Sequence, residues 1–318
     1  MAQIDSLPPE LLSHIFYLLY ENIKASKGLW RDMGPPLITS DLLLVSSHWH
    51  QVAITNPSLW THIPITRRTG SSERARKLVE RDLIRSKECP LDIVIHIELP
   101  ARSSPSESLL KDVAVYAHRW RTLTVHALTA EAGQILEQIY LPHLFSVLFV
   151  RRLDFASSMK LNAPNLKMLD GPRWESDSLV FEEPSPLFTE IRYSKSSNST
   201  ELLVSHLQRS QNTLKRLSLN IVHPHGVRIN IGATQTPPDT PELSFTALTD
   251  YAVEFNTRSW NWSVLNIGHM PLLRHLSLYW YIFEDFSSTS KIPFMPQLVS
   301  LKVSLDHGRR FKRIASAL

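Results

Sequence analysis

Apolar residues follow a helical pattern through the first twenty positions of the chain. Residues 4–19 read IDSLPPELLSHIFYLL, with Ser6 placed to cap a helix and two prolines suited to its first turn. The apolar positions form two rows: Leu7, Leu11, Ile15 and Leu18 in one, and Leu12, Phe16 and Leu19 in the other. This spacing predicts a helix that is apolar over more than half of its circumference. One row can pack within the chain, and the other needs a second partner, because so short a segment cannot bury both faces alone.

A second apolar segment follows after a break that is rich in glycine and proline. Residues 24–39 are predicted to be a loop, and Asp41 is predicted to cap a helix over DLLLVSSHWHQVA. One face of that helix would carry Leu42, Val45, Trp49 and Val52. The pair Asn56-Pro57 ends the helix, and Leu59-Trp60 follows as a hydrophobic anchor.

The order LPPELLSHIF, LLLVSSHWHQVA and NPSLW resembles the F-box over residues 4–60. The long stretch between the two helices looks like the lengthened form in large fungal F-box families. The resemblance implies docking to the Skp1-type subunit of a cullin ubiquitin ligase. The residues that match the motif are Leu7, Pro8, Leu11, Ile15, Val45 and Trp49. The alternative is a plain helical hairpin that packs onto the rest of the chain.

A pattern of the form L-x-x-L-x-L, often preceded by proline, recurs through the remainder of the chain. Its first positions are Leu144, Leu166, Phe188, Leu214, Leu248, Leu273 and Leu298, which lie 22, 22, 26, 34, 25 and 25 residues apart. Most of these intervals fall within the range of a leucine-rich repeat, in which the L-x-L tail is a short strand with one buried face. Neighbouring units would stack, because each cannot bury its apolar face alone.

The pattern extends toward the N-terminus and predicts the overall architecture. Residues 90–97 and 120–125 read as earlier strands, and residues 73–85 and 107–120 read as helical return segments. We therefore expect an α+β chain, with an F-box-like helical domain at 1–62 and an irregular α/β leucine-rich-repeat solenoid with a parallel sheet at 63–318. The repeats are irregular, and Asn220 alone occupies the defining asparagine position. The alternative interpretation is therefore an ordinary α/β domain. Residues 309–318 either cap the array or end a shortened chain.

In a repeat array the residues between the strand leucines lie on the concave face. The exposed positions expected to contact a client protein are Arg216, Ser218, Arg274, His275 and Lys302. Their basic and polar character would suit an acidic or phosphorylated partner. The alternative is a solvated sheet face with no partner.

Composition adds limits on the function. Hydrophobic residues make up 43% and charged residues 20%, which is typical of a soluble, core-forming chain. The net charge of +4 and the dispersed lysines and arginines do not favour nucleic-acid binding. A single cysteine, Cys89, excludes an intrachain disulfide, and the N-terminus does not look like a signal peptide. We expect a cytoplasmic or nuclear protein that does not bind membranes.

The sequence offers no arrangement of residues typical of an enzyme. It has nine glycines, no glycine-rich phosphate loop and no G-x-S-x-G motif, and Cys89 has no local base. We expect no catalysis, no cofactor and no metal. The predicted function is a substrate-receptor adaptor of an SCF-type (Skp1-cullin-F-box) ubiquitin ligase. The alternative is a repeat-based interaction scaffold or sensor that is not linked to ubiquitin. The sequence does not identify the client or its pathway.

Overall fold

The structure is a computed structural model, and the residues that it describes are 7–26, 37–66, 69–70, 72–97, 105–150, 159–174, 179–183, 185–195, 201–222, 243–256, 269–280 and 295–305. The chain forms two compact units, Met1–Val150 with Met159–Ala163, and Arg151–Ser158 with Pro164–Leu318. Both are mixed α/β with parallel strands, which confirms the expected class in general terms. The expected boundary between residues 62 and 63 lies inside the first unit, and that division stays a prediction.

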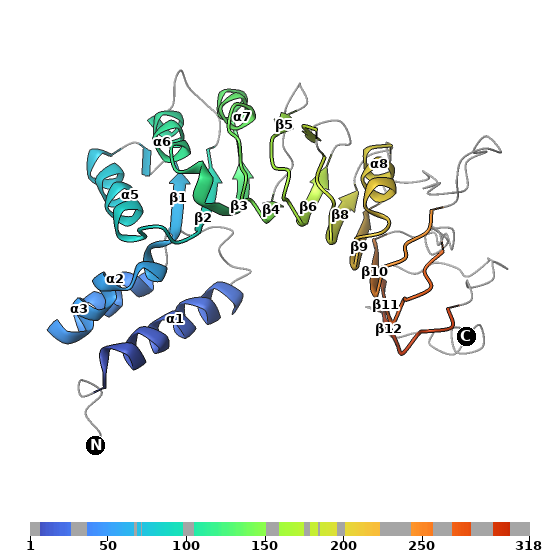
Figure 1. Cartoon of the computed structure of the whole chain (residues 1–318), viewed down its shortest axis with the longest axis horizontal. Coiled ribbons are helices and arrows are strands. Elements are labelled where there is room, and N and C mark those ends of the chain that lie inside the picture. The colour runs from blue at the N-terminus through green and yellow to red at the C-terminus, as the bar shows by residue number, and fades with distance from the viewer. Residues whose placement is uncertain are drawn as a thin grey trace. The chain divides into compact units, whose positions relative to one another are not determined.

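The described part of the first unit begins with helices that share one core. Their bounds are α1 (Pro9–Ser26), α2 (Leu37–Val45), α3 (Ser47–Thr55) and the short 3-10 helix η2 (Pro57–Trp60) (Figure 1). We call this shared core the helical core, and it consists of Leu12, Phe16, Tyr20, Leu42, Val52, Ala53, Leu59 and Trp60. The cap predicted at Ser6 and residues 27–36 of the predicted loop lie outside the described residues, whereas residues 24–26 and 37–39, also predicted as loop, are helical.

The prediction of a single helix that starts at Asp41 is wrong, because Ser46 separates two helices. Ser46 has extended backbone angles (φ −158°, ψ 166°), and its hydroxyl accepts a hydrogen bond from the Trp49 backbone N–H at 3.2 Å. This N-cap starts α3, while Asp41 lies inside α2. The predicted end of the helix at Asn56-Pro57 is confirmed, because α3 ends at Thr55. The Asn56 side chain then caps η2 by accepting a hydrogen bond from the Ser58 N–H, and Pro57 is the first residue of η2.

Parallel strands and crossover helices complete the described part of the first unit. The elements are β1 (His62–Thr66), α5 (Glu73–Arg85), β2 (Leu91–His96), α6 (Pro105–Ala114), η3 (Ala117–Arg119), β3 (Trp120–Ala127), α7 (Ala130–Glu137), β4 (Ser146–Phe149) and β5 (Met159–Leu161). Strands β1 to β4 pair in chain order, with α5, α6 and α7 along one side of them (Figure 1). The helix expected at 73–85 is confirmed. The one expected at 107–120 ends earlier, since Trp120 already belongs to β3.

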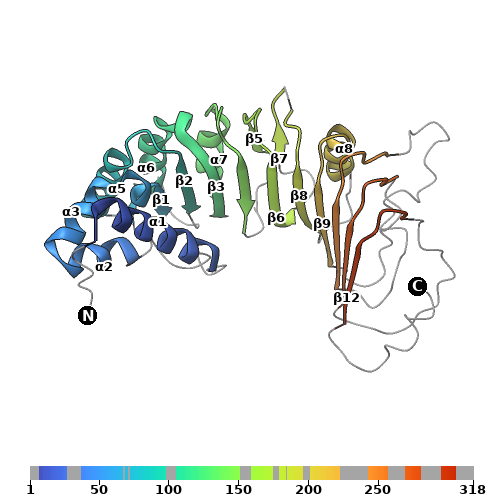
Figure 2. The ribbon, with the colours of Figure 1, turned by 60° about the horizontal axis from the view of Figure 1, so that its bottom comes forward.

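The second unit is built mainly from strands in its described part. They are β6 (Met168–Trp174), β7 (Leu179–Phe181), β8 (Glu190–Lys195), β9 (Arg216–Val222), β10 (Asp250–Asn256), β11 (His275–Trp280) and β12 (Ser300–Leu305), with helix α8 (Glu201–Ser210) between β8 and β9. Strands β6, β8, β9, β10, β11 and β12 pair in this order, all parallel. Figure 2 shows these strands side by side.

The strand register places the predicted leucine positions in buried rows. Leu217 of β9 is level with Tyr251 of β10, which is level with Leu276 of β11. Each of the three is at most 3% exposed, so the period-two prediction is confirmed here. The row continues to Leu301 of β12, where the side chain is only half-buried, because β12 is the edge strand of the described sheet.

The same hydrogen-bond arrangement recurs where strands of the second unit begin. One carbonyl oxygen accepts hydrogen bonds from the N–H groups of the last residue before the next strand and of that strand's first residue, as the Lys215 carbonyl does from Thr249 and Asp250 (3.0 and 3.1 Å). The carbonyls that do this are those of Lys167, Thr189, Lys215, Thr249 and Arg274. Each strand start is therefore fixed to its neighbour in one register, which keeps the side chains between the leucines in rows across the sheet.

Candidate functional site

Helix α1 has one buried face and one exposed apolar face. Leu12, Phe16 and Tyr20 are at most 2% exposed and belong to the helical core. On the opposite side Leu11, Ile15 and Leu18 are 53%, 44% and 52% exposed. We call these three residues the α1 stripe. It is the kind of surface that a second protein covers, because the described part of the chain leaves about half of each side chain in water.

Polar contacts hold α1 against the elements behind it. The Nε2 atom of His48 donates to the Leu7 carbonyl oxygen at 3.2 Å, and the Asn56 side-chain amide donates to the Ser13 carbonyl oxygen at the same distance. The rings of Phe16 and Trp49 pack 5.0 Å apart between centroids. These contacts hold the segment just before α1 and one side of its first half, which fixes the direction in which the α1 stripe points.

The residues that match the F-box motif do not all lie on the exposed surface. Pro8, Leu11, Ile15 and Val45 are exposed, with Val45 at 55%. Leu7 and Trp49 are half-buried and pack against the helical core, so the structure gives them a role in internal packing. Their contact with a partner stays a prediction. The sequence pattern did not single out Leu44, which is 84% exposed on α2.

An aromatic and charged contact joins the helical core to α5. The Trp60 indole N–H donates to the Ala53 carbonyl oxygen at 3.0 Å, and the guanidinium groups of Arg81 and Arg85 lie 5.1 and 4.4 Å from the Trp60 ring centroid. Burial raises the pKa of Asp82, although its ion pair with Arg81 at 2.7 Å opposes the shift. The helical core is therefore attached to α5 through aromatic and charged groups.

A second candidate surface lies on the strands of the second unit. A cavity of about 400 Å³ there is lined by Arg216, Ser218 and His275, three of the residues predicted to contact a client. Arg274 and Lys302 are also exposed, and the Lys302 ammonium lies 5.4 Å from the Tyr279 ring centroid. Neither of these two lines the cavity. Their contact with a client stays a prediction.

Acidic side chains offset the basic character that the sequence pattern indicates for this surface. The register places Arg216 of β9 level with Glu190 of β8 on one side and with Asp250 of β10 on the other. Glu190 accepts ion pairs from Arg192 at 2.7 Å and from Arg216 at 3.5 Å. The cavity is thus a mixed polar surface on which two arginines already have carboxylate partners.

The described residues were also compared with the requirements of a metal site and of a membrane-spanning helix. They contain no group of three or more His, Cys, Asp or Glu side chains placed to bind a metal ion. None of the described helices is both long and apolar enough to cross a bilayer. Comparison with protein-family models, with curated proteins and with solved structures finds no match for this chain.

Proposed function

We propose that this chain is a substrate-receptor adaptor of an SCF-type ubiquitin ligase. The observation that carries the proposal is the α1 stripe, since α1 buries one apolar row in its own core and leaves the other half-exposed. The order of leucine-proline, valine-tryptophan and proline-x-leucine-tryptophan segments over residues 4–60 supports the same function through its resemblance to the F-box. The partner at the α1 stripe would be a Skp1-type subunit.

The parallel strands of the second unit would form an irregular leucine-rich-repeat solenoid that holds a client protein. Support for this comes from the shared register of the leucine rows and from the repeated hydrogen bonds at the strand starts. In this mechanism the adaptor breaks and forms no bonds. It raises the concentration of the client near a ligase-bound ubiquitin donor, so that transfer becomes effectively intramolecular.

Co-purification of the full-length chain with a Skp1-type subunit tests the proposal. The wild-type chain is expected to retain the subunit, and the double variant Leu11→Asp with Ile15→Asp is expected to lose it, because it places two charges on the α1 stripe. Both side chains are about half-exposed, so the variant is expected to keep its fold. If the variant retains the subunit, the α1 stripe is not the docking surface. If the wild-type chain never binds the subunit, the helices serve a scaffold that is not linked to ubiquitin.

A further inference from the structure

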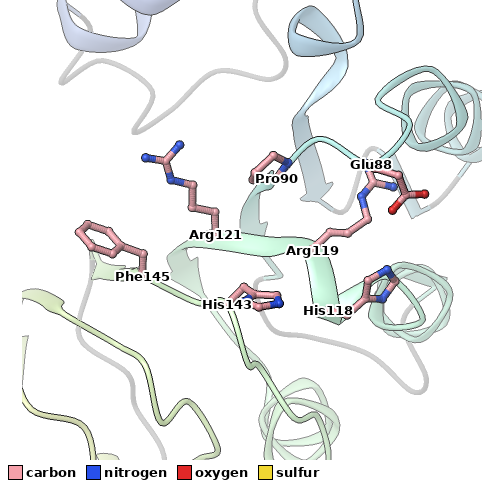
Figure 3. Close-up of a pocket in the computed structure, with 7 residues that line it drawn as sticks. All are labelled: Glu88, Pro90, His118, Arg119, Arg121, His143 and Phe145. Atoms are coloured by element: carbon pink, nitrogen blue, oxygen red, sulfur yellow. The ribbon is translucent and has the colours of Figure 1, made fainter.

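A pocket of about 520 Å³ lies in the first unit, where β2, β3 and β4 begin (Figure 3). Its walls come from the three segments that lead into these strands. Glu88 and Pro90 precede β2, and His143 and Phe145 precede β4. Between them, the segment around the start of β3 supplies a histidine and two arginines. Parallel pairing brings these segments together at one edge, although they are separated by more than twenty residues in the sequence.

Arg119 is the fixed group of this pocket. It is only 7% exposed, and its guanidinium group is held by three hydrogen bonds. Nε donates to the Cys89 carbonyl oxygen at 3.1 Å, and Nη2 donates to the same oxygen at 2.9 Å and to the Ser86 hydroxyl at 2.6 Å. A guanidinium group has five N–H donors, so the two on Nη1 remain. Among the described residues no acceptor binds Nη1. Nη1 is also absent from the polar atoms that are both fully buried and without a partner, so a ligand can reach it.

Further positive and hydrogen-bonding groups surround Arg119. Arg121 on β3 is exposed, as are the imidazoles of His118 and His143. In Figure 3 the guanidinium groups of Arg121 and Arg119 lie on opposite sides of Pro90, with that of Arg119 beside Glu88. Among the residues that line the pocket, Glu88 is the single carboxylate and its charge acts on Arg119, so Arg121 is the arginine without a carboxylate neighbour there. The cavity on the second unit differs, because there Glu190 pairs with both lining arginines.

The pocket also has an apolar part. Phe145 is 42% exposed, and Pro90 is exposed as well. A small inorganic anion would contact the donors and leave these two side chains in water. A ligand that joins an anionic group to an apolar group would bury both kinds of surface.

We propose that this pocket binds an oxyanion carried on an apolar group, as on a phosphorylated or acidic side chain of a partner protein. The oxygens accept hydrogen bonds from Arg119 and Arg121, whose planar guanidinium groups suit phosphate and carboxylate. The apolar group contacts Phe145 and Pro90. The proposal does not need the α1 stripe, so it can fail or succeed independently of ubiquitin-ligase docking.

Isothermal titration calorimetry of the full-length chain at pH 7 with phenyl phosphate, inorganic phosphate and benzoate tests the proposal. Phenyl phosphate is expected to bind at least several-fold tighter than inorganic phosphate. Arg121→Gln is expected to weaken it by roughly tenfold or more, because a hydrogen bond to a charged group contributes about 1.5–3 kcal/mol. Phe145→Ala is expected to remove the advantage of phenyl phosphate over inorganic phosphate. The affinity for benzoate relative to phenyl phosphate decides between a carboxylate and a phosphate source.

Arg74→Gln is the matched control, since it makes the same change at an exposed arginine of α5 that does not line the pocket. It is expected to leave the affinity for phenyl phosphate unchanged. The proposal is overturned if neither phenyl phosphate nor benzoate binds, or if Arg121→Gln binds as well as the wild-type chain with an unchanged unfolding curve. It is also overturned if inorganic phosphate binds as tightly as phenyl phosphate, or if Arg74→Gln causes the loss.

Discussion

Two neighbouring leucines of α1 test its division into a buried and an exposed face. Leu12 is 1% exposed and packs in the helical core, whereas Leu11 is 53% exposed. We expect Leu12→Ala to lower the free energy of unfolding by about 2–5 kcal/mol, because it removes buried methyl groups and leaves a cavity. We expect Leu11→Ala to lower it by about 1 kcal/mol or less, because half of that side chain is already in water.

Urea unfolding followed by tryptophan fluorescence measures both changes. Trp49 and Trp60 lie in or against the helical core, so the signal includes the region that is altered. With a urea dependence of about 1–3 kcal/mol per molar, Leu12→Ala is expected to shift the midpoint by on the order of 1 M or more. Leu11→Ala is expected to shift it only slightly. Equal shifts for the two variants would refute the assignment of the two faces of α1.

The same structure sets the magnitude of the proposed docking. The three side chains of the α1 stripe are each about half-exposed. Full burial of such a side chain contributes about 1.5–3 kcal/mol, so covering the exposed halves would contribute roughly 2–4 kcal/mol in total. That corresponds to a change of about 30- to 1,000-fold in a dissociation constant, before any polar contact is included.

Two further predictions concern positions away from the α1 stripe. Burial lowers the pKa of His206 to about 4, and the neighbouring Arg209 adds to the shift, so the folded chain keeps this ring neutral between Phe181 and Phe188. The unfolded chain binds a proton at this ring below about pH 6.5. The free energy of unfolding of the wild-type chain is therefore expected to fall by up to about 3 kcal/mol between pH 6.5 and 4, a loss that His206→Leu does not show. Urea unfolding at pH 7 and 4.5 measures the difference. A Cβ atom at Gly70 would lie 2.5 Å from the backbone N and Cα of Ser106, so Gly70→Ala is expected to destabilise the chain by about 1–3 kcal/mol, and a thermal midpoint unchanged from wild type would contradict this packing.

Periodicity predicted those elements whose form depends on one buried face. The rows of strand leucines were predicted because a half-buried strand repeats every two residues, and the register confirms them at Leu217 and Tyr251. The bounds of α5 were also predicted correctly. The two apolar rows were predicted except at two positions: Leu19 is 40% exposed while Tyr20 is buried, and Leu7 of the other row packs against the helical core.

Features that depend on contacts between distant residues were not predicted. The break at Ser46 places Trp49 against Phe16, and spacing within one segment does not reveal that choice. The carboxylate partner of Arg216, Glu190, lies on the neighbouring strand β8, so this ion pair emerges only when the register is known. The pocket around Arg119 was missed for the same reason, because its walls come from three separate segments.

The affinity of the full-length chain for a purified Skp1-type subunit tests the central proposal most directly. The double variant Leu11→Asp with Ile15→Asp is expected to weaken binding by about 100-fold or more, because it removes apolar contacts and places two charges in the interface. Leu78→Asp with Ile84→Asp is the matched control, since these α5 side chains are 44% and 66% exposed and lie outside the α1 stripe. The proposal predicts wild-type affinity for the control and loss for the α1 variant. No measurable binding by the wild-type chain, or equal affinity for both double variants, would contradict it.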